Sequence, residues 1–115
     1  MVKIEHYSFG SLKAGGRSYR DDVKIVAGQV RGDWWRKQGH LLQAGDIQDI
    51  LEDGPDILVL GTGSSGLLRV DPSLEDLLES RNIRLLAMPT AQAVERFNQL
   101  SARGERVAGA FHLTC

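Results

Sequence analysis

Residues 56–63 read DILVLGTG, and this stretch decides the fold class of the chain. Its apolar run, Ile57 to Leu60, ends at a glycine and is typical of a strand that is covered on both faces of a sheet. A helix is predicted to begin at Asp71-Pro72. Strands are predicted at residues 83–88 and 106–113, on either side of a helix that begins at Pro89-Thr90. Strands and helices that alternate over such short connections form βαβ units, so the C-terminal half is predicted to be α/β with parallel strands.

The N-terminal half predicts shorter elements. Residues 6–20 predict a hairpin, since alternating residues flank a Gly-Gly turn signal. Residues 23–27 predict a further strand with one solvent-exposed face. Residues 28–45 lack a sustained period and are interpreted mostly as an irregular loop. A short helix is predicted from Asp46 to a Gly-Pro stop, because apolar residues recur there at helical spacing.

The composition predicts a single domain over residues 1–115. The chain carries 14 basic and 15 acidic side chains, a net charge of −1, which argues against binding to nucleic acid or to an anionic membrane. No apolar run approaches the roughly 20 residues of a spanning helix, and the N-terminus lacks the apolar stretch of a secretory signal. Cys115 is the single cysteine, so an intramolecular disulfide is excluded and the expected location is a reducing cytoplasm.

A glycine-rich loop, GTGSSG at residues 61–66, follows the covered strand. It matches the G-x-G-x-x-G spacing of dinucleotide-binding folds, but the next helix starts late and the acidic residue that holds the ribose is missing. No Walker lysine and no G-x-S-x-G elbow occurs there, so no cofactor is predicted. The loop can still offer N–H and hydroxyl donors to a small anion; the alternative is a tight turn in which glycine only permits positive φ. The candidate residues are Gly61, Thr62, Gly63, Ser64 and Ser65.

A second unusual cluster is Trp34-Trp35-Arg36 with His40. Large aromatic side chains beside arginine can stack on a planar ligand or anchor a protein partner. The alternative is that a tryptophan covers a core with few other aromatic residues. Arg36 and His40 are also candidates to complete the anion site, if the fold brings them to the glycine-rich loop. The three histidines share no metal-ligand spacing, so no metal is predicted, and His112 is interpreted as a histidine satisfied within the sheet.

Several stretches carry a family resemblance: DWWR at 33–36, DILVLGTG at 56–63, LRV at 68–70, TAQAV at 90–94 with Asn98, and VAGAFHLTC at 107–115. In these the chain resembles the Mth938-like domain proteins, small α/β proteins that include a mammalian adipogenesis-associated member. The resemblance implies an α/β fold with a single three-layer domain. In this fold a mixed central β-sheet has helices on one side and a small antiparallel β layer on the other.

The resemblance implies little about activity, because most members of the family are uncharacterised and no catalytic set is established. A more distant mitochondrial relative is an assembly factor for respiratory complex I, which implies protein binding as one option. The first hypothesis is therefore a cytoplasmic interaction or assembly module, monomeric or homodimeric, that binds a protein through Trp34, Trp35 and Arg36. The second is a small-molecule or anion-binding protein, or a weak enzyme, built on residues 61–66 with Arg36 and His40. No catalytic residue is predicted under either hypothesis.

Overall fold

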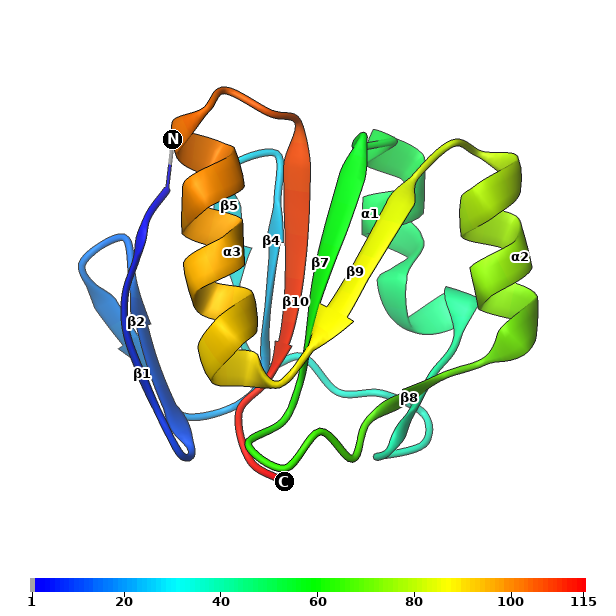
Figure 1. The fold of residues 1–115 in the computed structure, drawn as a ribbon. Coiled ribbons are helices and arrows are strands. Elements are labelled where there is room, and N and C mark those ends of the chain that lie inside the picture. The colour runs from blue at the N-terminus through cyan, green and yellow to red at the C-terminus, as the bar shows by residue number, and fades with distance from the viewer. Residues whose placement is uncertain (1) are drawn as a thin grey trace.

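A mixed five-stranded sheet lies at the centre of the computed structural model, which describes residues 2–115 (Figure 1). Its strands are β4 (Val23–Val26), β5 (Gln29–Arg31), β7 (Ile57–Thr62), β9 (Arg84–Met88) and β10 (Val107–His112). Their order is β5-β4-β10-β7-β9. β7 pairs in parallel with β9 and β10, whereas β4 pairs antiparallel with β10 and β5. The sheet thus joins strands from both halves of the chain.

β7 is the covered strand that the sequence predicts. All six of its residues are buried. Leu58 and Leu60 belong to one core cluster, and Ile57 and Val59 belong to the other. Side chains alternate between the two faces along a strand, so a strand with apolar neighbours on both faces needs an unbroken apolar run.

Helices and a second sheet cover the two faces. The 3-10 helix η1 (Ala44–Ile47), α1 (Gln48–Asp53) and α2 (Pro72–Ser80) pack on the face of Leu58 and Leu60. An antiparallel sheet covers the other face; it consists of β1 (Ile4–Ser8), β2 (Ser11–Ala14) and β3 (Arg17–Tyr19). The predicted α/β class, with a mixed sheet and a small antiparallel layer, is confirmed.

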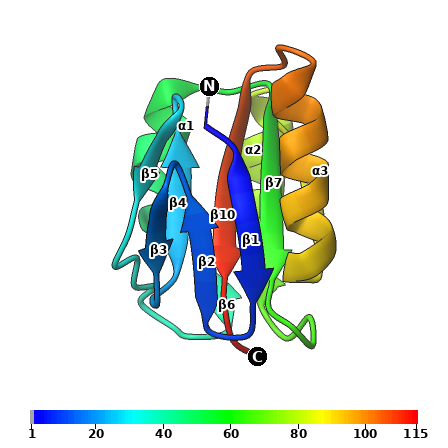
Figure 2. The same ribbon diagram turned by 90° about the vertical axis from the view of Figure 1, so that its left-hand side faces the viewer.

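The helix α3 (Thr90–Ala102) is placed differently from its expected position with the other helices. It lies beside β1, on the face of the three-stranded sheet (Figure 2). Its Phe97 belongs to the same core cluster as Val59 and Phe111. The chain moves outward from β7 to β9 through α2, and then back past β7 to β10 through α3. Right-handed crossovers that run in opposite directions must pass over opposite faces of a sheet.

Residues 28–45 hold more regular structure than the sequence predicts. β5 lies within them, and so does β6 (Leu41–Leu42), which pairs in parallel with β8 (Arg69–Val70). The prediction of a mostly irregular loop is wrong at these positions, because strands of two or three residues are too short to show a period of two. The β6–β8 pair brings this segment next to the residues that follow the glycine-rich loop.

Candidate functional site

Three segments that are distant in the sequence meet at the carboxyl end of β10. β10 ends at His112, and the antiparallel β4 places Val23 opposite Phe111, so Asp22 lies beside His112. The loop after β5 returns to this point, where the Trp34 N–H donates to the Asp22 carbonyl oxygen at 2.9 Å. This return brings Arg36 to the same end of the sheet.

Asp22, Arg36 and His112 form a buried hydrogen-bonded cluster, the Asp22 cluster. Asp22 Oδ2 lies 2.8 Å from both Arg36 Nη1 and His112 Nδ1, and Asp22 Oδ1 accepts from the Leu113 N–H at 2.8 Å. The side chains of Asp22, Arg36 and His112 are 14%, 5% and 9% exposed. A buried ion pair is stable only where its geometry is good and its other polar atoms have partners. The Asp22 carboxylate meets both conditions.

Arg36 is held on its other sides as well. Its Nε donates to the Gly39 carbonyl oxygen at 3.0 Å, and its guanidinium carbon lies 4.8 Å from the centre of the Trp34 ring. The Trp34 indole N–H donates in turn to the Asp46 carbonyl oxygen at 2.9 Å. These contacts fix the guanidinium plane against an aromatic face, a favourable arrangement for arginine.

The Asp22 carboxyl is held in its ionised form. Burial raises its pKa, but hydrogen bonds from His112, Leu113 and Arg36 lower the pKa by more, so the pKa of Asp22 lies below its ordinary value. The pKa of Asp49 is lowered in the same way: burial raises it, and Lys24 and Arg31 more than offset the increase. Both carboxylates therefore stabilise the folded state more when they are ionised.

We expect the protein to lose stability in acid. A carboxyl whose folded-state pKa is lowered contributes stability above its unfolded pKa of about 4, and the contribution is lost as the pH falls through the folded pKa. Urea unfolding measured from about pH 7 down to about pH 2 should show a constant free energy at first and a decline below about pH 4. In Asp22→Asn the decline should be shallower, and an unchanged decline would contradict the role assigned to Asp22.

A cavity of about 340 Å³ lies beside the Asp22 cluster. Trp35, Arg36, His40 and His112 are among the residues that line it. Trp35 is 76% exposed, whereas Trp34 is 5% exposed and belongs to the core. The alternative interpretation, that a tryptophan covers the core, therefore holds for Trp34. Of the two, only Trp35 presents its surface to solvent. The structure thus brings Arg36, His40 and Trp35 together.

The glycine-rich loop is not part of that cavity wall: among the described residues, none of 61–66 lines it. Three of its backbone N–H groups donate to oxygens of the protein itself. The Gly63 N–H donates to Thr90 Oγ1 at 2.9 Å, and the Ser64 N–H donates to the Thr114 carbonyl oxygen at 2.7 Å. The Gly66 N–H donates to the Gly63 carbonyl oxygen at 3.3 Å. These bonds describe a tight turn that anchors the C-terminal tail, residues 113–115.

Sequence reasoning missed Asp22 as a site residue and assigned His112 only a structural role. Asp22 is one of two adjacent aspartates before a strand, and such pairs are common in turns. The signal that could have found it is the antiparallel pairing of β4 with β10, which sets the start of one strand against the end of the other. That pairing joins segments some ninety positions apart, and nothing local encodes it.

Three segments that carry exposed apolar side chains lie near the C-terminal tail. Among residues 2–115 three large apolar side chains are exposed: Phe9 at 64%, Trp35 at 76% and Leu67 at 50%. Phe9 lies in the β1–β2 turn, where the Gly10 N–H donates to the Leu113 carbonyl oxygen at 2.8 Å. Trp35 lines the cavity together with Thr114, and Leu67 follows the loop that Thr114 anchors. Figure 1 shows the β1–β2 turn, the β7–β8 loop and the C-terminus at one end of the molecule. We call Phe9, Trp35 and Leu67 the tail patch.

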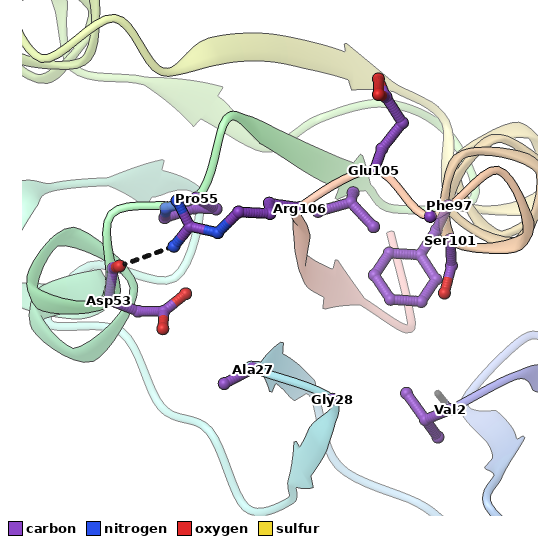
Figure 3. Close-up of a pocket in the computed structure, with 11 residues that line it drawn as sticks. Val2, Ala27, Gly28, Asp53, Pro55, Phe97, Ser101, Glu105 and Arg106 are labelled. Atoms are coloured by element: carbon purple, nitrogen blue, oxygen red, sulfur yellow. Dashed lines mark hydrogen bonds between the residues drawn. The ribbon is translucent and has the colours of Figure 1, made fainter.

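A second cavity, of about 370 Å³, lies at the other end of the sheet, where β10 begins (Figure 3). Val2, Ala27 and Phe97 contribute to its wall, and Arg106 Nη2 donates to the Asp53 carbonyl oxygen at 3.2 Å beside it. This cavity is slightly larger than the one beside Trp35, but no predicted site residue lines it.

Residues 2–115 contain neither a cluster of metal-binding side chains nor a membrane-spanning helix. No group of three or more His, Cys, Asp or Glu side chains in this range could hold a metal ion. No helix in this range is long and apolar enough to cross a membrane.

Comparison with known proteins identifies relatives over nearly the whole chain. A family model described as "Protein of unknown function (DUF498/DUF598)" matches residues 4–112. A solved structure called MT938 is 28% identical, with a TM-score of 0.82 and 100% of both chains covered. An outer membrane protein from Bartonella henselae is 29% identical, with a TM-score of 0.84 over 99% of this chain and 96% of that chain. A Mth938-like domain protein from Bordetella pertussis shares the fold at 19% identity, with a TM-score of 0.68 over 96% of this chain and 85% of that chain.

Proposed function

The chain belongs to the Mth938-like family of uncharacterised proteins described as DUF498/DUF598, and from its surface we propose that it is a protein-binding module rather than an enzyme. The tail patch is the observation that carries this proposal. Exposed apolar side chains scattered singly are ordinary, but a gathered group often marks an interaction site. Phe9, Trp35 and Leu67 come from three separate segments, and each segment is bonded to the C-terminal tail or lines a cavity with it. Aromatic residues are also enriched among the side chains that dominate binding energies.

The rigid support under the patch favours the same function. Trp35 follows the buried Trp34 and precedes Arg36, and both neighbours are fixed by hydrogen bonds. The turn that carries Phe9 and the loop that leads to Leu67 are both bonded to the C-terminal tail. A surface that is ordered before binding loses less conformational entropy when a partner docks.

An anion held by the glycine-rich loop has less support. The N–H groups of Gly63, Ser64 and Gly66 already donate to protein oxygens, so they are not free to bind a ligand. An anion bound by these three N–H groups would have to replace their bonds to Thr90, to the C-terminal tail and to Gly63. The protein partner is therefore the function that the geometry favours.

The proposal is tested by affinity capture from the host cell with tagged variants. Trp35→Ser should weaken retention of the specific partner by about 30-fold, which corresponds to the roughly 2 kcal/mol of a central aromatic contact. Phe9→Ser with Leu67→Ser should also reduce retention, because both residues belong to the same patch. The matched control is Arg103→Ala, an exposed change just after α3, at the other end of the molecule. Equal retention by Trp35→Ser and Arg103→Ala would contradict the proposal.

We further propose that the module works in the cytoplasm. The support is compositional: one exposed free cysteine, Cys115, and no possibility of an internal disulfide. The relative from Bartonella henselae is called an outer membrane protein, so the two locations compete. Fractionation of host cells decides between them, with the protein expected in the cytoplasmic fraction; recovery in the membrane fraction would contradict it.

A further inference from the structure

His112 carries a buried polar atom that has no partner. Its side chain is 9% exposed, and Nε2 is the buried side-chain nitrogen or oxygen for which no hydrogen bond is found among the described residues. Most buried polar atoms in folded proteins are hydrogen-bonded, and one left unpaired costs about 1–3 kcal/mol. An exception of this kind calls for a specific explanation.

The hydrogen bonds define which ring nitrogen carries the proton. Asp22 Oδ2 is an acceptor and lies 2.8 Å from His112 Nδ1, so Nδ1 must carry the hydrogen. With one hydrogen on the ring, Nε2 keeps its lone pair and acts as an acceptor. Carboxylates fix histidine tautomers in this way in many functional sites.

The same assignment frees a donor on Arg36. Nη2 of Arg36 lies 3.1 Å from His112 Nδ1, but a nitrogen that donates to Asp22 has no lone pair left to accept from Nη2. The guanidinium therefore retains N–H groups without an acceptor next to an imidazole with an unused lone pair. Arg36 and His112 also line the same cavity of about 340 Å³.

We propose that this cavity binds a small oxyanion that keeps one proton, such as hydrogen phosphate or hydrogen carbonate. The hydroxyl group of the anion donates to His112 Nε2, and an unprotonated oxygen accepts from Arg36 Nη2. An anion without a proton satisfies only the arginine, and a neutral hydroxyl compound lacks the charge that strengthens the bond to the guanidinium. The proposal concerns a different ligand from the protein partner above and does not rest on that function.

The rest of the wall suits this ligand. Arg20 lines the cavity and offers a further positive charge, which Asp21 at the same wall partly offsets. The exposed His40 packs edge-on against His112, with ring centres 5.9 Å apart and planes at 74°. His112 Nε2 is buried, so a neighbouring side chain must move before the anion reaches it. In this proposal the exposed His40 ring is the side chain that moves, and it makes no hydrogen bond to the anion.

The test is a side-chain ¹⁵N NMR titration of the histidines in the intact protein. The free protein should show His112 as the Nδ1–H tautomer. Addition of sodium phosphate near neutral pH should move the Nε2 resonance of His112 to saturation. Sodium sulfate has the same tetrahedral shape but carries no proton at this pH, so it should leave that resonance in place. No saturable shift with phosphate, or an equal shift with sulfate, overturns the proposal.

Two variants sharpen the test. His112→Asn keeps an amide N–H that can replace the Nδ1 donor to Asp22 but removes the Nε2 acceptor, so phosphate binding measured by calorimetry should fall at least 10-fold. His40→Ala should retain the binding. Loss of binding in His40→Ala with retention in folded His112→Asn would overturn the assignment. If His112→Asn does not fold, the wild-type titration still decides.

Discussion

Replacement of Asp22 by alanine is expected to lower the free energy of unfolding by about 3–5 kcal/mol, the typical cost of removing one partner from a buried ion pair. The substitution removes acceptors for Arg36, His112 and the Leu113 N–H at once. The side chain of Arg36 is only 5% exposed, so water cannot replace the carboxylate without rearrangement. Urea unfolding followed by tryptophan fluorescence measures the change.

The neighbouring residue provides the control for this prediction. Asp21 is also acidic and precedes the same strand, but it is exposed. Asp21→Ala should change the free energy of unfolding by no more than about 0.5 kcal/mol, as is usual for surface substitutions. Similar losses in the two variants would mean that general charge, and not the buried cluster, stabilises this end of the molecule.

Replacement of Gly63 by alanine is the second change with a large expected effect. Gly63 has φ +101, and a Cβ added there would lie 2.8 Å from the carbonyl oxygens of both Thr114 and Cys115. These are backbone atoms of the tail, so relief requires the tail to move and the bond from Ser64 to Thr114 to break. Backbone strain of about 1–3 kcal/mol and a comparable packing cost add up to a loss of about 2–6 kcal/mol.

A second variant, at Gly28, separates the cost of backbone strain from the cost of packing. It has φ +76, and nothing lies within 4 Å of an added Cβ. Gly28→Ala therefore carries the strain alone and should cost about 1 kcal/mol. Gly63→Ala should also weaken binding of the partner that is captured through the tail patch, whereas Gly28→Ala should leave that binding unchanged. Equal losses of stability in both variants would show that the tail is free to move.

The elements that the sequence predicts correctly are those whose signals are local. The apolar run Ile57 to Leu60 needs no knowledge of its neighbours to indicate a doubly covered strand, and its burial confirms this. The cap at Asp71 is equally local, since its carboxylate accepts from the Ser73 N–H at 2.9 Å. The face chosen by α3 depends on the order of strands in the sheet, which no local pattern encodes.

The candidate site depends even more on distant contacts. Trp34 and Trp35 are adjacent and have the same local chemistry, yet one is buried and the other is the most exposed large apolar residue described. Apolar residues do not recur at a regular spacing in their segment, so the sequence does not indicate which of the two side chains points into the core. The sequence marks Arg36 as a candidate anion-binding residue, but Asp22, which pairs with its Nη1, lies outside every motif in the sequence. The sequence identifies Arg36 as a candidate, but it does not identify Asp22 as the residue that binds it.

Site-specific photo-crosslinking in the host cell tests the central claim, that the tail patch is the partner-binding surface. A benzophenone side chain is introduced in place of Trp35 in one variant and in place of Ala102, at the exposed end of α3, in another. We predict that position 35 yields one discrete crosslinked polypeptide and that position 102 yields none. A crosslink from position 102 with none from position 35 would contradict the claim and move the partner to the opposite end of the molecule.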